Sequence, residues 1–210
     1  MMRFSCRSRW PLVLLMALTT SALESSGAQV VYGPGAKYPS TKADADFMQG
    51  MIGHHAQAIV MAKEAKSHGA SPAVQVFCER IDVAQTNEIR LMQNWLRERH
   101  FTVPDSTGAM AMEMPDMPGM THTMVMFMPG MLTPEQMQLL DEARGPSWDR
   151  LFLTFMIQHH QGALTMVDTL FNSPGAGQDE TIFKFATAVH ADQTAEIDRM
   201  KSMLAGGRRH

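Results

Sequence analysis

Apolar positions recur at helical spacing in four long stretches of the chain, and no alternating run of the kind that forms strands competes with them. The stretches cover about residues 41–67, 71–100, 147–171 and 179–204. The first ends at Gly69, and Ser71-Pro72 then supplies an N-cap and a first-turn proline for the second. A turn at Asn172-Ser173-Pro174-Gly175 separates the other two. The pattern predicts an all-α protein, a four-helix bundle of two hairpins over residues 41–205.

The segment that joins the two hairpins has a different composition. Residues 101–132 contain four prolines and three glycines, which prevent a long helix or a central strand. Thr133-Pro134-Glu135-Gln136 then has the form of a capping box and predicts a short helix over residues 133–144. We therefore expect a long loop, followed by a short helix, between the hairpins.

The N-terminal residues have the composition of a targeting segment. Three arginines precede an apolar stretch from Trp10 to Leu18, and small residues follow at Ser26-Gly27-Ala28. This order is typical of a cleaved secretory signal peptide over residues 1–28. A transmembrane helix is not expected here, because the apolar stretch is too short to span a bilayer. An uncleaved anchor is the alternative. Cleavage would leave a flexible lead over residues 29–40, and Cys78 as the only cysteine, so no intramolecular disulfide could form.

The two hairpins are copies of one another. Residues 51–61 contain Met-Ile-Gly-His-His at their start and Met at their end, and residues 156–166 repeat this pattern without a gap. Gln85, Glu88 and Met92 of the second helix correspond in the same way to Gln193, Glu196 and Met200 of the fourth helix. The chain is therefore a duplicated helical hairpin, with repeats over 41–100 and 147–205.

Helical geometry places the repeated polar residues on the faces that should be buried. At 100° per residue, the two methionines and the first histidine of each motif share one stripe, and the second histidine lies at its flank. The repeated Gln and Glu lie on the apolar stripe of the other helix of each hairpin. Buried polar groups need partners, and the histidines across the bundle are the obvious ones.

This pattern of ligand types indicates a soft metal ion. The candidate ligands are Met51, His54, His55, Met61, Met156, His159, His160 and Met166. Di-iron bundles place Glu three residues before His, whereas this chain has Met there. Thioether and imidazole together favour copper, Cu(I) in particular, with Cu(II) also open at the histidines. The imidazoles would be oriented by the repeated polar residues Gln85, Glu88, Gln193 and Glu196. Direct binding of the metal by the two Glu is one alternative, and a hydrogen-bonded network that binds no metal is the other. His68, His100 and His210 lie at helix or chain ends, where we expect them to be solvated.

Methionine is also concentrated in the loop between the hairpins. The chain has 21 methionines, and nine of them fall in the 22 residues from Met110 to Met131 without helical period. Such a segment can surround a soft ion with thioethers and an imidazole. The candidate loop ligands are Met112, Met114, Met117, Met120, His122, Met124 and Met126. A partner-binding surface or a linker that absorbs oxidation is the alternative interpretation.

The doubled His-His motif, the Gln-x-x-Glu-Ile-x-x-Met pattern after each copy and Ser-Trp-Asp-Arg-Leu-Phe-Leu at residues 147–153 resemble the domain of unknown function 305 (DUF305) family. The resemblance extends over about Asp46 to Met203. It implies a ferritin-like four-helix bundle that is exported in bacteria and is similar to a periplasmic copper-binding protein contributing to copper tolerance. It also implies that the His-His pairs and their flanking methionines bind the metal.

These observations together predict an exported copper-binding protein that is not an enzyme and that buffers, stores or transfers copper. Its partners would be the metal ion and a copper-delivery or efflux protein. The formal net charge of -3 gives no basis for nucleic-acid or membrane-surface binding. We expect copper affinity to fall below about pH 6, where ordinary imidazoles are protonated. One alternative is a ferritin-like di-metal oxidoreductase that uses the histidines together with Glu88 and Glu196. The other is an interaction module that uses the methionine-rich loop.

Overall fold

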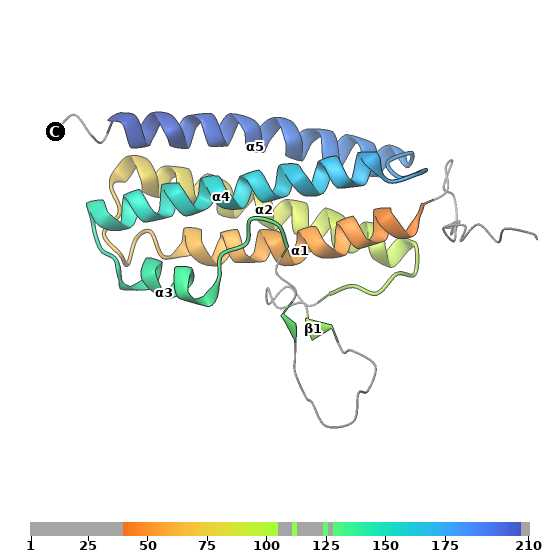
Figure 1. The fold of residues 1–210 in the computed structure, drawn as a ribbon, viewed down its shortest axis with the longest axis horizontal. Coiled ribbons are helices and arrows are strands. Elements are labelled where there is room, and N and C mark those ends of the chain that lie inside the picture. Colours follow the sequence, from red (N-terminus) through yellow and green to blue (C-terminus); the bar gives the residue numbers. More distant parts are fainter. Residues whose placement is uncertain (1–39, 105–110, 113–123, 126–127, 207–210) are drawn as a thin grey trace, which may run out of the picture.

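The computed structural model describes residues 40–104, 111–112, 124–125 and 128–206, and most of this chain is helical. The helices are α1 (Lys42–Lys63), α2 (Pro72–Glu98), α3 (Pro134–Glu142), α4 (Pro146–Asn172) and α5 (Glu180–Gly206) (Figure 1). Two-residue strands β1 (Ala111–Met112) and β2 (Met124–Val125) pair antiparallel within the connection that was expected to be a loop. The all-α bundle is confirmed, whereas the predicted signal peptide and lead lie outside the described residues, except for Ser40.

The helix ends follow local chemistry. Thr41 and Asp44 form a capping box at the start of α1, in which the Thr41 amide donates to the Asp44 carboxylate over 2.7 Å. Prolines occupy the first turns of α2, α3 and α4, where a missing amide proton costs nothing. α1 ends at Lys63, four residues earlier than the apolar pattern predicts, because the chain turns before Gly69 adopts a left-handed φ of 70°.

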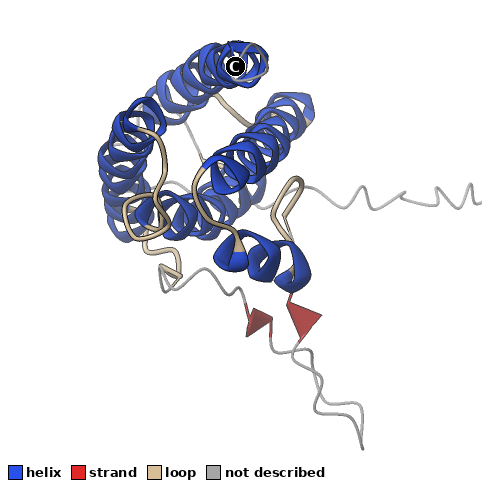
Figure 2. Cartoon of the chain, turned by 90° about the vertical axis from the view of Figure 1, so that its left-hand side faces the viewer, coloured by secondary structure: helices blue, strands red, loops and turns tan. Residues whose placement is uncertain are grey.

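The long helices pack as two hairpins that meet through α1 and α4. α2 packs on α1, α5 packs on α4, and α1 and α4 run in opposite directions against one another (Figure 1). The short α3 and the strand pair lie on the side of the bundle away from α5 (Figure 2). Within the described residues, no helix is both long and apolar enough to cross a membrane.

The core divides into two apolar clusters. One, at the end where α1 begins, includes Met51, Met92 and Met166, and the other includes Met61, Met156 and Met200. The buried histidines of the repeated motif lie on the stretch of α1 and α4 between the flanking methionines. The centre of the bundle is therefore polar, with apolar packing on both sides.

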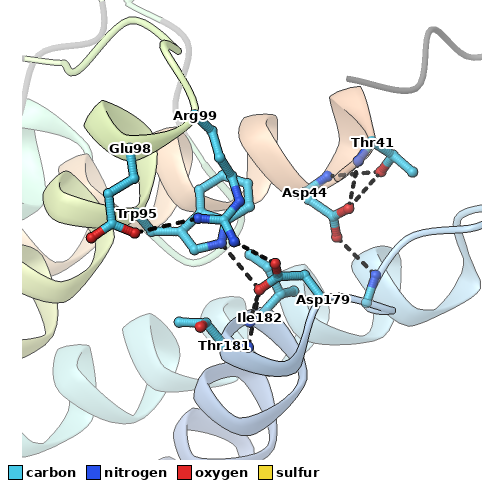
Figure 3. A network of polar contacts seen from close by, with 9 residues as sticks. Thr41, Asp44, Trp95, Glu98, Arg99, Asp179, Thr181 and Ile182 are labelled. Atoms are coloured by element: carbon cyan, nitrogen blue, oxygen red, sulfur yellow. Dashed lines mark hydrogen bonds and ion pairs between the residues drawn. The ribbon is translucent and has the colours of Figure 1, made fainter. Parts of the chain in front are cut away.

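A polar network closes one end of the bundle (Figure 3). The buried Asp179 carboxylate accepts hydrogen bonds from the Trp95 indole (3.2 Å), the Arg99 guanidinium and the amides of Thr181 and Ile182. Burial alone would raise the pKa of Asp179, but these donors outweigh it and hold the pKa below its usual value of 3.8. Asp44 adds a hydrogen bond from the Gly177 amide. The network joins the α4–α5 turn to the start of α1 and the end of α2.

We predict that Asp179→Asn lowers the free energy of unfolding by about 2–3 kcal/mol at neutral pH, because charged hydrogen bonds to Trp95 and Arg99 are lost. The lowered pKa means that the stabilisation is complete above 3.8 and disappears as the pH falls through the folded-state pKa. Urea unfolding at several pH values measures this. Asp198→Asn, at an exposed site on α5, is the control, and equal stability of both variants at neutral pH would contradict the prediction.

Candidate metal centre

The two His-His motifs meet at the centre of the bundle. His54 on α1 and His159 on α4 face one another with ring centroids 3.8 Å apart and ring planes inclined by 38°. The ring centroids of His55 and His160 lie 6.4 and 6.2 Å from those of their chain neighbours. All four side chains are completely buried. The repeats therefore form one central histidine cluster rather than two separate ones.

Three of these imidazoles have the same tautomer, because each faces a hydrogen-bond acceptor. His54 Nε2 donates to the Pro129 carbonyl oxygen over 3.1 Å. His55 Nε2 donates to Glu88 over 2.6 Å, and His160 Nε2 donates to Glu196 over 2.7 Å. A neutral imidazole has one N–H, so a proton held on Nε2 leaves a lone pair on Nδ1. This is how metal-binding histidines are commonly oriented.

The Nδ1 lone pairs have no partner among the described residues. The Nδ1 atoms of His54, His55, His159 and His160 are all buried without a hydrogen bond, as is Nε2 of His159. Leaving one buried polar atom without a hydrogen bond costs about 1–3 kcal/mol of folding free energy. Five such atoms together are unusual in the core of a helical bundle. One of the two His159 nitrogens carries the proton of the neutral ring, so four of the five atoms offer a lone pair. A metal ion accepts such lone pairs and would remove most of this cost.

Burial keeps the central pair uncharged. It lowers the pKa of His54 to about 3, a shift to which the neighbouring His55 and His160 add and which the Pro129 hydrogen bond partly offsets. The pKa of His159 also lies well below its usual value, first because of burial and then because of His54 and the other two histidines. A fall of copper affinity below about pH 6 remains an expectation, but His54 does not contribute to it, because its pKa lies near 3.

The predicted methionine ligands flank the histidines in two mixed sets. Met51 of the first repeat shares an apolar cluster with Met166 of the second, and Met61 of the first shares the other cluster with Met156 of the second. Met92 joins the first set and Met200 the second. Sequence reasoning aligned Met92 and Met200 as repeat partners but did not include them among the ligands. Because α1 and α4 are antiparallel, each set draws thioethers from both repeats.

The four repeated Gln and Glu residues behave differently from one another. Glu88 and Glu196 contact the imidazoles, whereas the side-chain oxygens of the buried Gln85 and Gln193 have no hydrogen-bond partner. All four line a cavity of about 430 Å³ between α2 and α5, together with Arg80 and Arg199. His55 and His160 are thus separated from this cavity by a single carboxylate each.

A short segment covers the opposite side of the histidine cluster. Residues 128–132, which we call the strap, lie along α1 and α4. The Gln57 side chain accepts from the Leu132 amide over 2.7 Å and donates to the Leu132 carbonyl over 3.0 Å. Gly130 lies against Gly162 so closely that a Cβ on Gly162 would stand 1.8 Å from the Pro129 oxygen. The strap is not predicted from the sequence, although Pro129-Gly130 and the glycine at 162 are signals of a tight backbone approach.

Other predicted residues fall outside this centre. Only the backbone of Met112 and Met124 is described, and Met114, Met117, Met120, His122 and Met126 lie outside the described residues. His68 was expected to be solvated, but it is buried. Its ring nitrogens contact the carbonyl oxygens of Glu64 and Asp141, and Asp141 belongs to the C-terminal end of α3. His100 is exposed, and His210 is outside the described residues.

Carboxylates and histidines alone do not form a metal site. Among the described residues, no three His, Cys, Asp or Glu side chains are grouped so that they could hold an ion. Glu88 and Glu196 each contact a different histidine. A metal in this centre would therefore need methionine sulfur in addition to imidazole nitrogen.

The fold and its centre define a class of helical bundle proteins with duplicated His-His motifs. The DUF305 family model, described as a domain of unknown function, matches residues 44–204, and the chain belongs to this family. No curated protein sequence matches the chain.

Solved structures agree with this assignment. A DUF305 protein from Streptomyces coelicolor, predicted to be secreted, is 26% identical over 79% of this chain and 93% of its own, with a TM-score of 0.63. CopM in its Cu(II)-bound form is 27% identical over 78% of this chain and 96% of its own, with a TM-score of 0.57. CopM in its Ag-bound form is 25% identical over the same shares, with a TM-score of 0.55.

We predict that the His54 imidazole of the metal-free protein stays neutral from about pH 8 to about pH 5, because burial lowers its pKa to about 3. Long-range proton–nitrogen NMR correlation spectra report both protonation and tautomer. We expect His54, His55 and His160 to show the Nε2–H tautomer. Titration of His54 near pH 6.5, the ordinary value for histidine, would contradict the prediction.

Proposed function

We propose that this protein binds copper at the central histidine cluster and its two flanking methionine sets, and that it buffers, stores or transfers the ion in copper tolerance. The observation that supports this most strongly is the set of unpartnered, buried Nδ1 atoms on four histidines. They come from duplicated motifs and lie between duplicated thioether sets. CopM, to which the chain is similar, has Cu(II)-bound and Ag-bound forms.

The donor types favour Cu(I) within this proposal. Thioether sulfur is soft and uncharged, so it suits Cu(I) better than Mg²⁺, Ca²⁺ or iron, and imidazole accepts either oxidation state of copper. The proposed ligands are the Nδ1 atoms of His54, His55, His159 and His160 and the sulfurs of Met51, Met61, Met156 and Met166. Glu88 and Glu196 would hold the Nε2 protons of His55 and His160, so that Nδ1 faces the ion. Cu(II) would use the same imidazole nitrogens, with methionine sulfur completing the set of ligands.

The neutral state of the central histidines bears on how such a protein works. A ligand that is already deprotonated releases no proton when it binds a metal, so its affinity does not fall in mild acid. His54, whose pKa is lowered to about 3, meets this condition. Because ordinary histidines with a pKa near 6.5 are only about 3% neutral at pH 5, a site built from them would lose affinity there.

Export and delivery complete the proposal. The signal-peptide pattern over residues 1–28 supports transport out of the cytoplasm, as does the similarity to a Streptomyces coelicolor protein predicted to be secreted. We propose that residues 110–126, with their seven methionines, collect soft ions and that a copper-delivery or efflux protein is the partner.

The two alternative functions have less support. A di-metal oxidoreductase needs carboxylates that converge on a pair of ions, and in the described part of the chain Glu88 and Glu196 pair with separate histidines. An interaction module would use the methionine-rich loop. That function does not explain why imidazole nitrogens are buried without hydrogen bonds at the centre of the bundle.

We predict that the protein without its signal segment, residues 29–210, retains Cu(I) against a competing chelator under anaerobic conditions, and that His54→Leu/His159→Leu loses at least about tenfold in affinity. Leucine fills much of the ring volume, so a folded variant is expected. His100→Leu/His190→Leu, with both histidines exposed, is the matched control and should bind as the original chain does.

The outcomes separate the hypotheses. Copper retained by the central double variant would move the site to the methionine-rich loop. Iron or manganese bound with oxygen consumption would favour the oxidoreductase, and absence of any tight metal would favour the interaction module.

A further inference from the structure

The strap meets the two central helices at three successive levels. Its Met128 reaches Gly50 and Met166, its Pro129 carbonyl accepts from His54, and its Leu132 bonds to Gln57. On the α4 side, Gln158 donates to the Gly130 carbonyl oxygen over 3.3 Å. Along α1 each contact is one helical turn from the next, so the strap follows this helix and brings Met128 within one turn of the histidine cluster.

The duplication is broken at the positions that touch the strap. Gln57 binds the strap, whereas its repeat partner Gly162 gives the strap backbone room to approach. Gln158 binds the strap, and its repeat partner is Gly53. The ligand positions of the two repeats are identical, so these differences point to a function for the strap on one side of the bundle.

The third such position makes room for a sulfur atom. A Cβ on Gly50 would stand 3.3 Å from Met128 Sδ and 3.3 Å from the Met166 methyl carbon, so both thioether side chains lie over this glycine and are neighbours. The repeat partner of Gly50 is Phe155, which packs against the other cluster. Only the half of the centre with Met51 and Met166 therefore has space for a strap methionine.

We propose that Met128 is an additional soft-metal ligand, which completes the Met51 and Met166 side of the centre and makes its two halves unequal. Met128 is partly buried and packs on the cluster that contains Met51, Met92 and Met166. A monovalent soft ion such as Cu(I) or Ag(I) suits this set of uncharged sulfurs. The proposal rests on the metal-binding function proposed above.

The Pro129 carbonyl links this ligand to the histidines. It accepts the His54 Nε2 proton from the residue directly after Met128, so the same short segment would supply a sulfur and fix the tautomer of an imidazole. Pro129 is in this sense a positioning residue, and Met128 is the group that touches the ion.

Methyl NMR of the protein labelled with carbon-13 at the methionine methyl groups tests the proposal, with Ag(I) as the redox-inert probe. Met128→Leu assigns the Met128 signal and conserves volume, so the fold is expected to persist. We expect the Met128 methyl signal to shift in the same titration step as those of Met51 and Met166. Met128→Leu should lower the Ag(I) affinity of that step at least about tenfold.

Met131→Leu is the matched control, because Met131 lies three residues further along the same strap and belongs to neither core cluster. The Ag(I) affinity of this variant, and the methyl signal shifts of its Met51, Met128 and Met166, should equal those of the original chain. Shifts at Met51 and Met166 without a shift at Met128, or unchanged affinity of Met128→Leu, would overturn the proposal and leave the central site intact. If none of the methionine signals responds to Ag(I), the proposed function is overturned as well.

Discussion

The contact between His54 and His159 at the α1–α4 interface is the constraint on which the rest of this molecule depends. Two imidazoles with ring centroids 3.8 Å apart in a bundle core cannot both carry charge, and their burial keeps them neutral. The interface that joins the two hairpins is therefore also the place where nitrogen lone pairs gather. Stability and ligand chemistry compete at this point, because apolar residues would pack there without unpaired polar atoms.

The surroundings of the cluster compensate for this cost on two sides. On the α2 and α5 side, Glu88 and Glu196 hold the outer histidines, and on the opposite side the strap holds His54 through a backbone carbonyl. The apolar clusters pack at both ends, and the Asp179 network fixes one end of the bundle at a distance from the histidines. The rigidity of the helices and the chemistry of the centre are thus supplied by different residues.

Much of the fold could be predicted from sequence because its determinants are local. Apolar periodicity, proline positions and the Thr133 capping box located the helices to within a few residues, and α1 was misjudged only where the turn before Gly69 replaced its last residues. The repeated motif likewise placed the histidines on inward faces. The strap could not be predicted, because its contacts join Gln57 to Leu132 and Gly162 to Pro129, and such distant pairings follow from packing rather than from spacing. The same limit applies to the low pKa of His54, which arises from complete burial.

Crystals of the protein loaded with Ag(I) would test the central claim most directly, since an anomalous difference map locates the ion without reference to sequence or fold. The account predicts a peak between α1 and α4, in contact with Nδ1 atoms of the His54 and His159 pair and with methionine sulfur. A peak confined to residues 105–127, or one held by Glu88 and Glu196 without histidine or methionine, would contradict it.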